Sequence, residues 1–201
     1  MQESPPIPSR KAPNLPKGRV SIPNARYFLT INTKGRKPGL NTPKISEQIK
    51  RALRELHASR EIELFCGTIM PDHIHLVIRL GRKLSLPQVV RKFKFLTTQY
   101  LRIANLMWQH NYFDHYVRLK ESLESYALYV FLNPYRKELI SLDDSWQGWF
   151  LHREFRPKFL ESLSDGEYPH KEWLKNAKNL EDTISAGKSL NGTQNLRAAS
   201  K

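Results

Sequence analysis

The sequence predicts an α+β fold in which a four-stranded antiparallel sheet carries helices on one face, with a further helix after the last strand. Four short segments rich in β-branched and aromatic residues indicate the strands. Longer segments between them place apolar residues at helical spacing. Two of the strand segments are joined by Pro71 and Asp72 alone, which predicts a hairpin and therefore antiparallel pairing.

The first half of the predicted domain supplies three strands and one helix. Residues 27–33 read YFLTINT and predict a strand, and the Gly and Pro residues of 34–39 end it in a loop. Apolar residues recur every three or four positions in residues 46–58, which predicts a helix with basic side chains between them. Residues 61–70 and 73–80 predict the two strands of the hairpin.

The second half adds a long helix, a strand and a shorter helix. Residues 86–104 predict a helix that Ser85 caps at its N-terminus. Residues 112–119 predict the fourth strand, and residues 122–132 predict a helix that ends before Pro134. The order β-α-β-β-α-β followed by a helix is that of the ferredoxin-like, or split βαβ, fold.

Composition divides the chain into three parts. Residues 1–23 hold six prolines and predict a disordered basic arm. The apolar periodicity lies in residues 24–152, which are expected to form the folded domain. Residues 153–201 are expected to form a C-terminal extension that is largely disordered after about residue 176.

The chain is strongly basic, with 33 Lys and Arg against 19 Asp and Glu and a formal net charge of +14. Residues 20–152 hold +9 of this excess, from 20 basic and 11 acidic side chains. Positive charge concentrated in the folded part indicates a polyanionic partner such as nucleic acid. A solubilising surface charge is the alternative.

Several classes of protein are excluded. The single cysteine, Cys66, excludes an intramolecular disulfide framework and a metal site built from clustered cysteines. The longest apolar run is ALYVFL at residues 127–132, far short of the roughly 20 residues that a membrane span needs. The N-terminal residues lack the apolar core of a secretory signal. We therefore expect a cytoplasmic protein with no membrane contact.

Two histidines lie at a spacing that suits metal binding. His73 and His75 are two residues apart on a predicted strand, where alternate side chains share a face. Two imidazole nitrogens on one face can bind one metal ion. A pair of hydrogen-bonded histidines on a half-exposed strand is the alternative, and the spacing alone does not exclude it.

A tyrosine and an asparagine share a face of the last predicted helix. Tyr129 and Asn133 are four residues apart, about 6 Å along the helix axis. The Asn133 amide oxygen could be a third metal ligand, and the Tyr129 phenol could attack a phosphodiester polarised by the metal. An ordinary core tyrosine and an asparagine at a helix end are the alternatives. Tyr126 competes as nucleophile, but it is about 10.5 Å from Asn133 along the axis, so Tyr129 is preferred.

These motifs occur in the order found in a known family. The string MPDHIHL at residues 70–76 and the pattern YxxxNP at residues 129–134 resemble the REP-associated tyrosine transposases, which belong to the single-tyrosine HUH superfamily. The resemblance extends over about residues 24–150. The matching residues between the two motifs are Phe93, Lys94, Thr97, Trp108, Gln109, Tyr112, Phe113, Asp114, His115 and Arg118.

The resemblance implies an enzyme that cleaves and rejoins single-stranded DNA near hairpins such as REP sequences. It implies a 5′-phosphotyrosine intermediate on Tyr129 and a Mg²⁺ or Mn²⁺ ion bound by His73, His75 and Asn133. The partner would be single-stranded or hairpin DNA, bound at the bacterial nucleoid by a monomer or a homodimer. A non-catalytic hairpin DNA- or RNA-binding protein on the same fold is the alternative. That alternative predicts a degraded metal triad, whereas all four residues are present.

Basic side chains are the expected DNA contacts. Arg91, Lys92 and Lys94 cluster on the long predicted helix, and Arg118 ends the fourth strand. Lys and Arg neutralise phosphates, so DNA binding should weaken as salt rises. A solvated helix face is the alternative for Arg91 and Lys92. The aromatic candidates for stacking on an unpaired base, with core packing as their alternative, are Trp108 and Tyr112.

Overall fold

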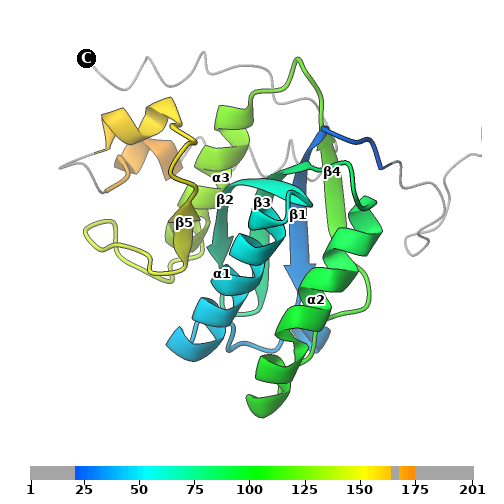
Figure 1. Cartoon of the computed structure of the whole chain (residues 1–201). Helices are drawn as coiled ribbons and strands as arrows, with labels where there is room; N and C mark the ends of the chain where they lie inside the picture. The colour runs from blue at the N-terminus through cyan, green and yellow to red at the C-terminus, as the bar shows by residue number, and fades with distance from the viewer. Residues whose placement is uncertain (1–20, 164–167, 175–201) are drawn as a thin grey trace, which may run out of the picture.

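The protein contains a five-stranded antiparallel sheet, one strand more than predicted (Figure 1). The computed structural model describes residues 21–163 and 168–174. The order across the sheet is β4-β1-β3-β2-β5, with the predicted hairpin β2–β3 near its centre. The strands are β1 (Arg26–Asn32), β2 (Ile62–Ile69), β3 (His73–Leu80), β4 (Phe113–Val117) and β5 (Trp149–Leu151).

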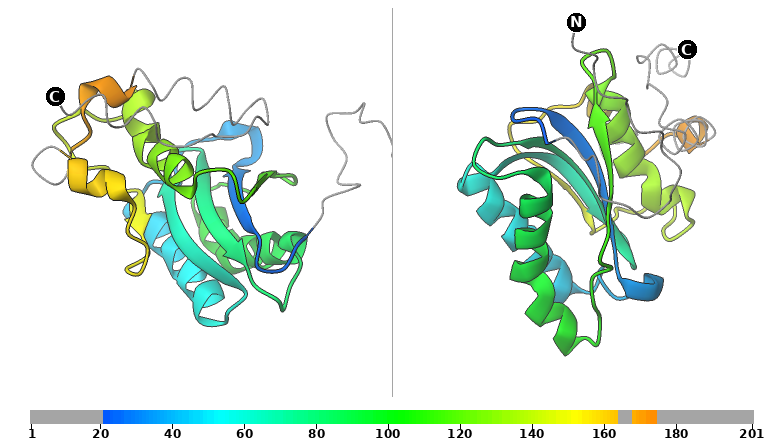
Figure 2. Two further views of the ribbon diagram at one scale, coloured as in Figure 1. Left: turned by 90° about the horizontal axis from the view of Figure 1, so that it is seen from above. Right: turned by 90° about the vertical axis from the view of Figure 1, so that its right-hand side faces the viewer.

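Three α-helices cover the sheet on both of its faces (Figure 2). Helices α1 (Pro43–Ala58) and α2 (Leu86–Ile103) pack side by side on one face. Helix α3 (Leu123–Arg136) packs on the opposite face against β2 and β3. Short 3-10 turns lie at Lys34–Arg36 and Lys158–Ser162. The expectation of helices on one face is therefore correct for α1 and α2, and α3 adds a third layer.

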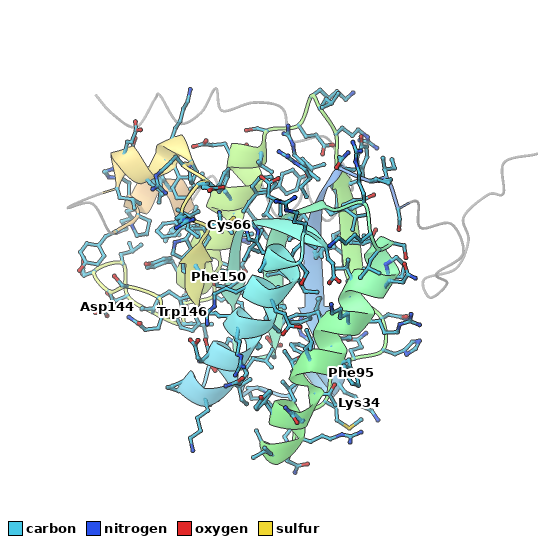
Figure 3. All side chains as sticks on the ribbon, viewed as in Figure 1. Lys34, Cys66, Phe95, Asp144, Trp146 and Phe150 are labelled. Atoms are coloured by element: carbon cyan, nitrogen blue, oxygen red, sulfur yellow. The ribbon has the colours of Figure 1, made fainter. Side chains whose placement is uncertain are left out.

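Strand alternation explains why the sheet can be covered on both faces. Successive side chains of a strand point to opposite faces, so an apolar strand can serve two cores. In β1, Tyr27 and Leu29 pack under α1 and α2, whereas Phe28 packs under α3. Cys66 lies in the second core together with α3 (Figure 3). Both faces of the central strands are thus closed by helices.

Strand β5 was missed in the sequence because it has only three residues, too few to show a period of two. It pairs with the outer edge of β2, where Cys66 lies opposite Leu151 and Thr68 opposite Trp149. This pairing joins segments about 80 residues apart, and no local signal reports it. The strand therefore extends the sheet by one edge strand, next to β2.

Helix α3 continues through Pro134 to Arg136, although the sequence predicted its end before the proline. A proline within a helix removes one backbone hydrogen bond and crowds the preceding turn. Here the loss falls in the last turn, and every residue from 125 to 135 is buried. Packing of that apolar surface outweighs the local penalty, because a helix that is apolar all round is stabilised by burial.

The chain beyond residue 152 contributes to the second core. Phe159 and Trp173 are buried there, with Phe159 against Phe131 of α3. The predicted disorder of the arm and of the last 25 or so residues concerns segments outside the described residues, apart from positions 21–23. Within the part that the structure describes, no helix has the length and apolar character to cross a membrane.

Candidate active site

The two histidines predicted to share a face of β3 meet each other on the sheet face that α3 covers. His73 and His75 are both buried, and their Nε2 atoms are 3.0 Å apart. The rings are nearly perpendicular, with centroids 4.6 Å apart. The two ring nitrogens that a metal ion would use therefore converge on one point.

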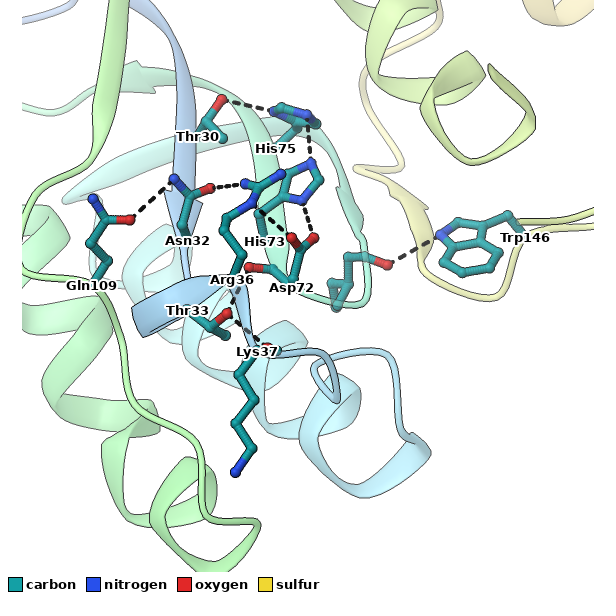
Figure 4. Close-up of polar contacts among 11 residues, drawn as sticks. Thr30, Asn32, Thr33, Arg36, Lys37, Asp72, His73, His75, Gln109 and Trp146 are labelled. Atoms are coloured by element: carbon teal, nitrogen blue, oxygen red, sulfur yellow. Dashed lines mark hydrogen bonds and ion pairs between the residues drawn. The ribbon is translucent and has the colours of Figure 1, made fainter. Parts of the chain in front are cut away.

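The opposite nitrogen of each imidazole is held by a neighbouring side chain (Figure 4). The Nδ1 atom of His75 lies 2.9 Å from the hydroxyl of Thr30, which faces it across the β1–β3 ladder. The Nδ1 atom of His73 lies 2.6 Å from a carboxylate oxygen of Asp72. Partners of this kind fix ring orientation and leave Nε2 directed at the site.

Asp72 is itself held by Arg36, whose Nε lies 2.8 Å from its second oxygen. The same guanidinium donates to the side-chain oxygen of Asn32 at 2.6 Å. Because a carboxylate only accepts, His73 carries its proton on Nδ1 and presents the lone pair of Nε2 toward His75. The contacts from Arg36, in the 3-10 turn after β1, through Asp72 thus orient the imidazole of His73.

Burial keeps both imidazoles neutral, which is the form that binds metals. It lowers the pKa of His73, although the nearby Asp72 carboxylate raises it in part. Burial also holds the pKa of His75 well below its usual value, and the adjacent His73 adds to this effect. Neutral, converging imidazole nitrogens with fixed outer partners are a donor set that fits a divalent cation.

Tyr129 packs directly against one member of this pair, His75. Its ring centroid is 5.6 Å from that of His75 and 5.6 Å from that of Phe28. In the described part of the chain its hydroxyl has no hydrogen-bond partner, and the residue is 5% exposed. The guanidinium of Arg136 lies over the ring, 5.2 Å from its centroid. A phenol without a hydrogen bond beside two imidazoles is available for chemistry at that point.

Tyr126, the competing nucleophile, is occupied in a different cluster. Its hydroxyl donates to the buried carboxylate of Glu121 at 3.2 Å, and its ring stacks on His115. Burial and the Glu121 charge raise the pKa of Tyr126. Glu121 also accepts from His115 at 2.9 Å and from Arg118. This cluster joins β4 to the start of α3 and leaves Tyr129 as the tyrosine at the histidine pair.

Asn133 lies one helical turn beyond Tyr129 and is buried. Its amide nitrogen lies 3.4 Å from the backbone carbonyl oxygen of Tyr129, to which it donates. Among the described residues it makes no hydrogen bond to either histidine. The amide nitrogen is directed at the helix, so the amide oxygen is the atom that could bind a cation. The role of Asn133 as the third metal ligand stays a prediction.

The structure places the four predicted DNA contacts in different surroundings. Lys92 forms an ion pair with Glu61 at 2.8 Å, and the Arg118 guanidinium lies 3.3 Å from Glu121. Lys94 donates to backbone carbonyls of residues 109–111. Arg91 is exposed on α2.

Sequence reasoning missed the cations that surround the histidine pair. Arg36, Arg136 and Lys137 are close enough for their charges to contribute to the low pKa of His75 or His73. Arg136 and Lys137 come two and three residues after the end of the YxxxNP pattern, and their place one helical turn after Asn133 was the available signal. Arg36 lies in a loop, so no periodicity could point to it.

Comparisons with known proteins show the family and a similar fold. The family model described as "Transposase IS200 like" matches residues 21–131, which is more than half of the chain. A Haemophilus influenzae protein named as a REP-associated tyrosine transposase is 23% identical over 146 residues, covering 65% of this chain and 81% of the relative. The solved structure of a REP-associated tyrosine transposase bound to a REP hairpin is similar with a TM-score of 0.59 and 20% identity, covering 76% of this chain and 90% of that one.

Proposed function

The chain belongs to the IS200-like transposase family, and we propose that it is a metal-dependent DNA transposase that cleaves and rejoins single-stranded DNA near hairpins. The expected resemblance to this family is confirmed, with distant homology to REP-associated tyrosine transposases. One observation carries the proposal. Tyr129 packs against His75, whose Nε2 atom meets that of His73 at 3.0 Å on the face under α3.

In this proposal His73, His75 and Asn133 bind a Mg²⁺ or Mn²⁺ ion. The bound ion would polarise the scissile phosphodiester and offset the charge that develops on it. The chain supplies the rest of the site through fixed outer contacts. Asp72 and Thr30 hold the two imidazoles in place, so little reorganisation is needed when DNA arrives.

Tyr129 would act as the nucleophile. Its phenolic oxygen attacks the phosphorus in line and forms a phosphotyrosine with the 5′ phosphate of the downstream strand. The phenol loses its proton, the bond from phosphorus to the 3′ oxygen breaks, and that oxygen takes up a proton to leave a free 3′-hydroxyl. Attack by a 3′-hydroxyl on the phosphotyrosine reverses these changes and joins strands.

Arg136 would hold the phosphate next to the tyrosine. Its guanidinium lies over the Tyr129 ring, on the same side of α3 as the nucleophile. An arginine can donate two parallel hydrogen bonds to phosphate oxygens, which fixes the orientation as well as the charge. The expected effect is alignment of the phosphorus with the phenolic oxygen.

The test is formation of a covalent adduct with a hairpin oligonucleotide that has a single-stranded flank. We expect wild type and Tyr116→Phe, a change at a half-exposed tyrosine on the edge strand, to give an adduct on a denaturing gel with Mn²⁺. Tyr129→Phe should give none and still bind the hairpin. Tight binding by wild type without an adduct would favour the non-catalytic binder, and an adduct lost in Tyr126→Phe but kept in Tyr129→Phe would reassign the nucleophile.

A further inference from the structure

A cavity of about 420 Å³ opens between α2 and the segment of residues 107–112. It lies on the α2 side of the sheet, so it is separate from the histidine pair. Buried Val90 and Leu101 contribute apolar surface to it, and Trp108 and Tyr112 supply aromatic rings. Its volume is within the range that bound small molecules occupy.

The wall formed by residues 107–112 is held in place by the protein. The ammonium of Lys94 donates to the carbonyl oxygens of residues 109–111 at 2.7, 3.0 and 3.4 Å. The indole N–H of Trp108 donates to the hydroxyl of Thr97 at 2.8 Å, and its ring packs on Phe93. The cavity therefore has its shape before any ligand enters, which lowers the entropic cost of binding.

The charge of the lining points to an anion. Arg91 and Arg102 are exposed and line the cavity together with Lys94, and no Asp or Glu is among the lining residues. Aromatic rings combined with guanidinium groups are the usual means of binding unpaired nucleotides, with the base stacked and the phosphate paired. A wholly apolar ligand would make no use of the guanidinium groups of Arg91 and Arg102.

Gln109, which lines the cavity, lies beside Asn32 in the neighbourhood of the histidine pair (Figure 4). Gln109 donates its backbone N–H to the carbonyl oxygen of Asn32 at 2.8 Å. Asn32 in turn lies opposite His73 in the β1–β3 ladder, where neighbouring strands are about 4.8 Å apart. A DNA strand crossing Asn32 and Gln109 would thus pass from one site to the other.

We propose that this cavity binds an unpaired nucleotide of the DNA substrate, with its base against Trp108 and Tyr112 and its phosphates against Arg91 and Arg102. The inference rests on the proposed function, because DNA with a single-stranded flank supplies the nucleotide. It also gives the aromatic residues that precede β4 a place in recognition.

The first test compares two oligonucleotides, a hairpin with a single-stranded flank and the same hairpin without it. For the flanked DNA, Arg91→Ala with Arg102→Ala should reduce the slope of log affinity against log salt by about 1.4, since each single-strand phosphate contact contributes about 0.7. The bare hairpin should show no change in slope. Arg51→Ala, at an exposed arginine of α1, is the control and should behave as wild type on both.

The second test places 4-thiothymidine at single positions of the flank and maps the photocrosslink. We expect attachment within residues 107–112, in the tryptic peptide of residues 103–118. The proposal is overturned if the slope falls equally on both oligonucleotides, if it does not fall on either, or if crosslinks form only outside residues 107–112. A protein segment would then be the remaining candidate to occupy the cavity. Both tests need binding alone, so a missing Tyr129 adduct would end the enzyme proposal without deciding this one.

Discussion

Replacing Asp72 with asparagine tests whether the histidine pair is a metal site. The carboxylate lies 2.6 Å from Nδ1 of His73 and 2.8 Å from Arg36. Asparagine keeps the shape and removes the charge, so the imidazole becomes a weaker donor and its orientation is less firmly held. Loss of such an outer partner weakens metal binding about 10- to 100-fold, or about 1.4 to 2.7 kcal/mol.

The structure favours the lower part of that range. The Asp72 side chain is 21% exposed and that of Arg36 is 53% exposed, so water screens the charge. We expect Asp72→Asn to raise the Kd for Mn²⁺ about 10- to 30-fold in calorimetric titration of the full chain. Glu63→Gln is the matched control, because it removes a carboxylate from the exposed pair with Arg79. Equal Mn²⁺ affinity in Asp72→Asn and wild type would refute the metal site.

Two further predictions address the nucleophile's surroundings and the limits of the fold. Arg136→Gln should slow adduct formation about 10- to 100-fold in single-turnover assays at saturating DNA, because a preorganised charge near the phosphate is lost. Lys120→Gln, a change at an exposed lysine after β4, is the control, and equal rates in the two variants would contradict this role. Phe159→Ala should lower the free energy of unfolding in urea by about 3 to 5 kcal/mol, since it empties a buried aromatic site against Phe131 and Trp173. A loss below about 1 kcal/mol would mean that the segment after residue 152 is not part of the cooperative fold.

Periodicity in the sequence predicted most of the sheet and helices because those elements are long enough to repeat. The expected helices at 46–58 and 86–104 correspond to α1 and α2 within a few residues at each end. The strand at 73–80 was predicted with its observed bounds, and its period of two correctly placed both histidines on one face. The covering of both faces of the sheet by helices was not predicted. The segment that forms α3 is apolar on all sides, so its sequence does not indicate which face of the sheet it covers.

The site was less predictable because its supports come from loops and from pairing across the sheet. The residue type and spacing of His73 and His75 predicted metal binding, but Asp72 was accounted for by the turn after Pro71. Thr30 meets His75 only through the β1–β3 register, and Arg36 reaches Asp72 from a turn with no repeating pattern. Tertiary contacts of this kind leave no signal at a fixed spacing along the chain.

The basic cluster on α2 shows why charge along a sequence does not equal a DNA-binding surface. Neighbouring residues on a helix point about 100° apart, so Lys92 faces away from the surface that Arg91 and Lys94 share. Lys92 turns to Glu61 before β2, and Lys94 turns to the carbonyls of residues 109–111. Both charges are thereby committed within the protein and contribute little to counterion release. Salt dependence should therefore follow the exposed guanidinium of Arg91 more than the charge of the whole cluster.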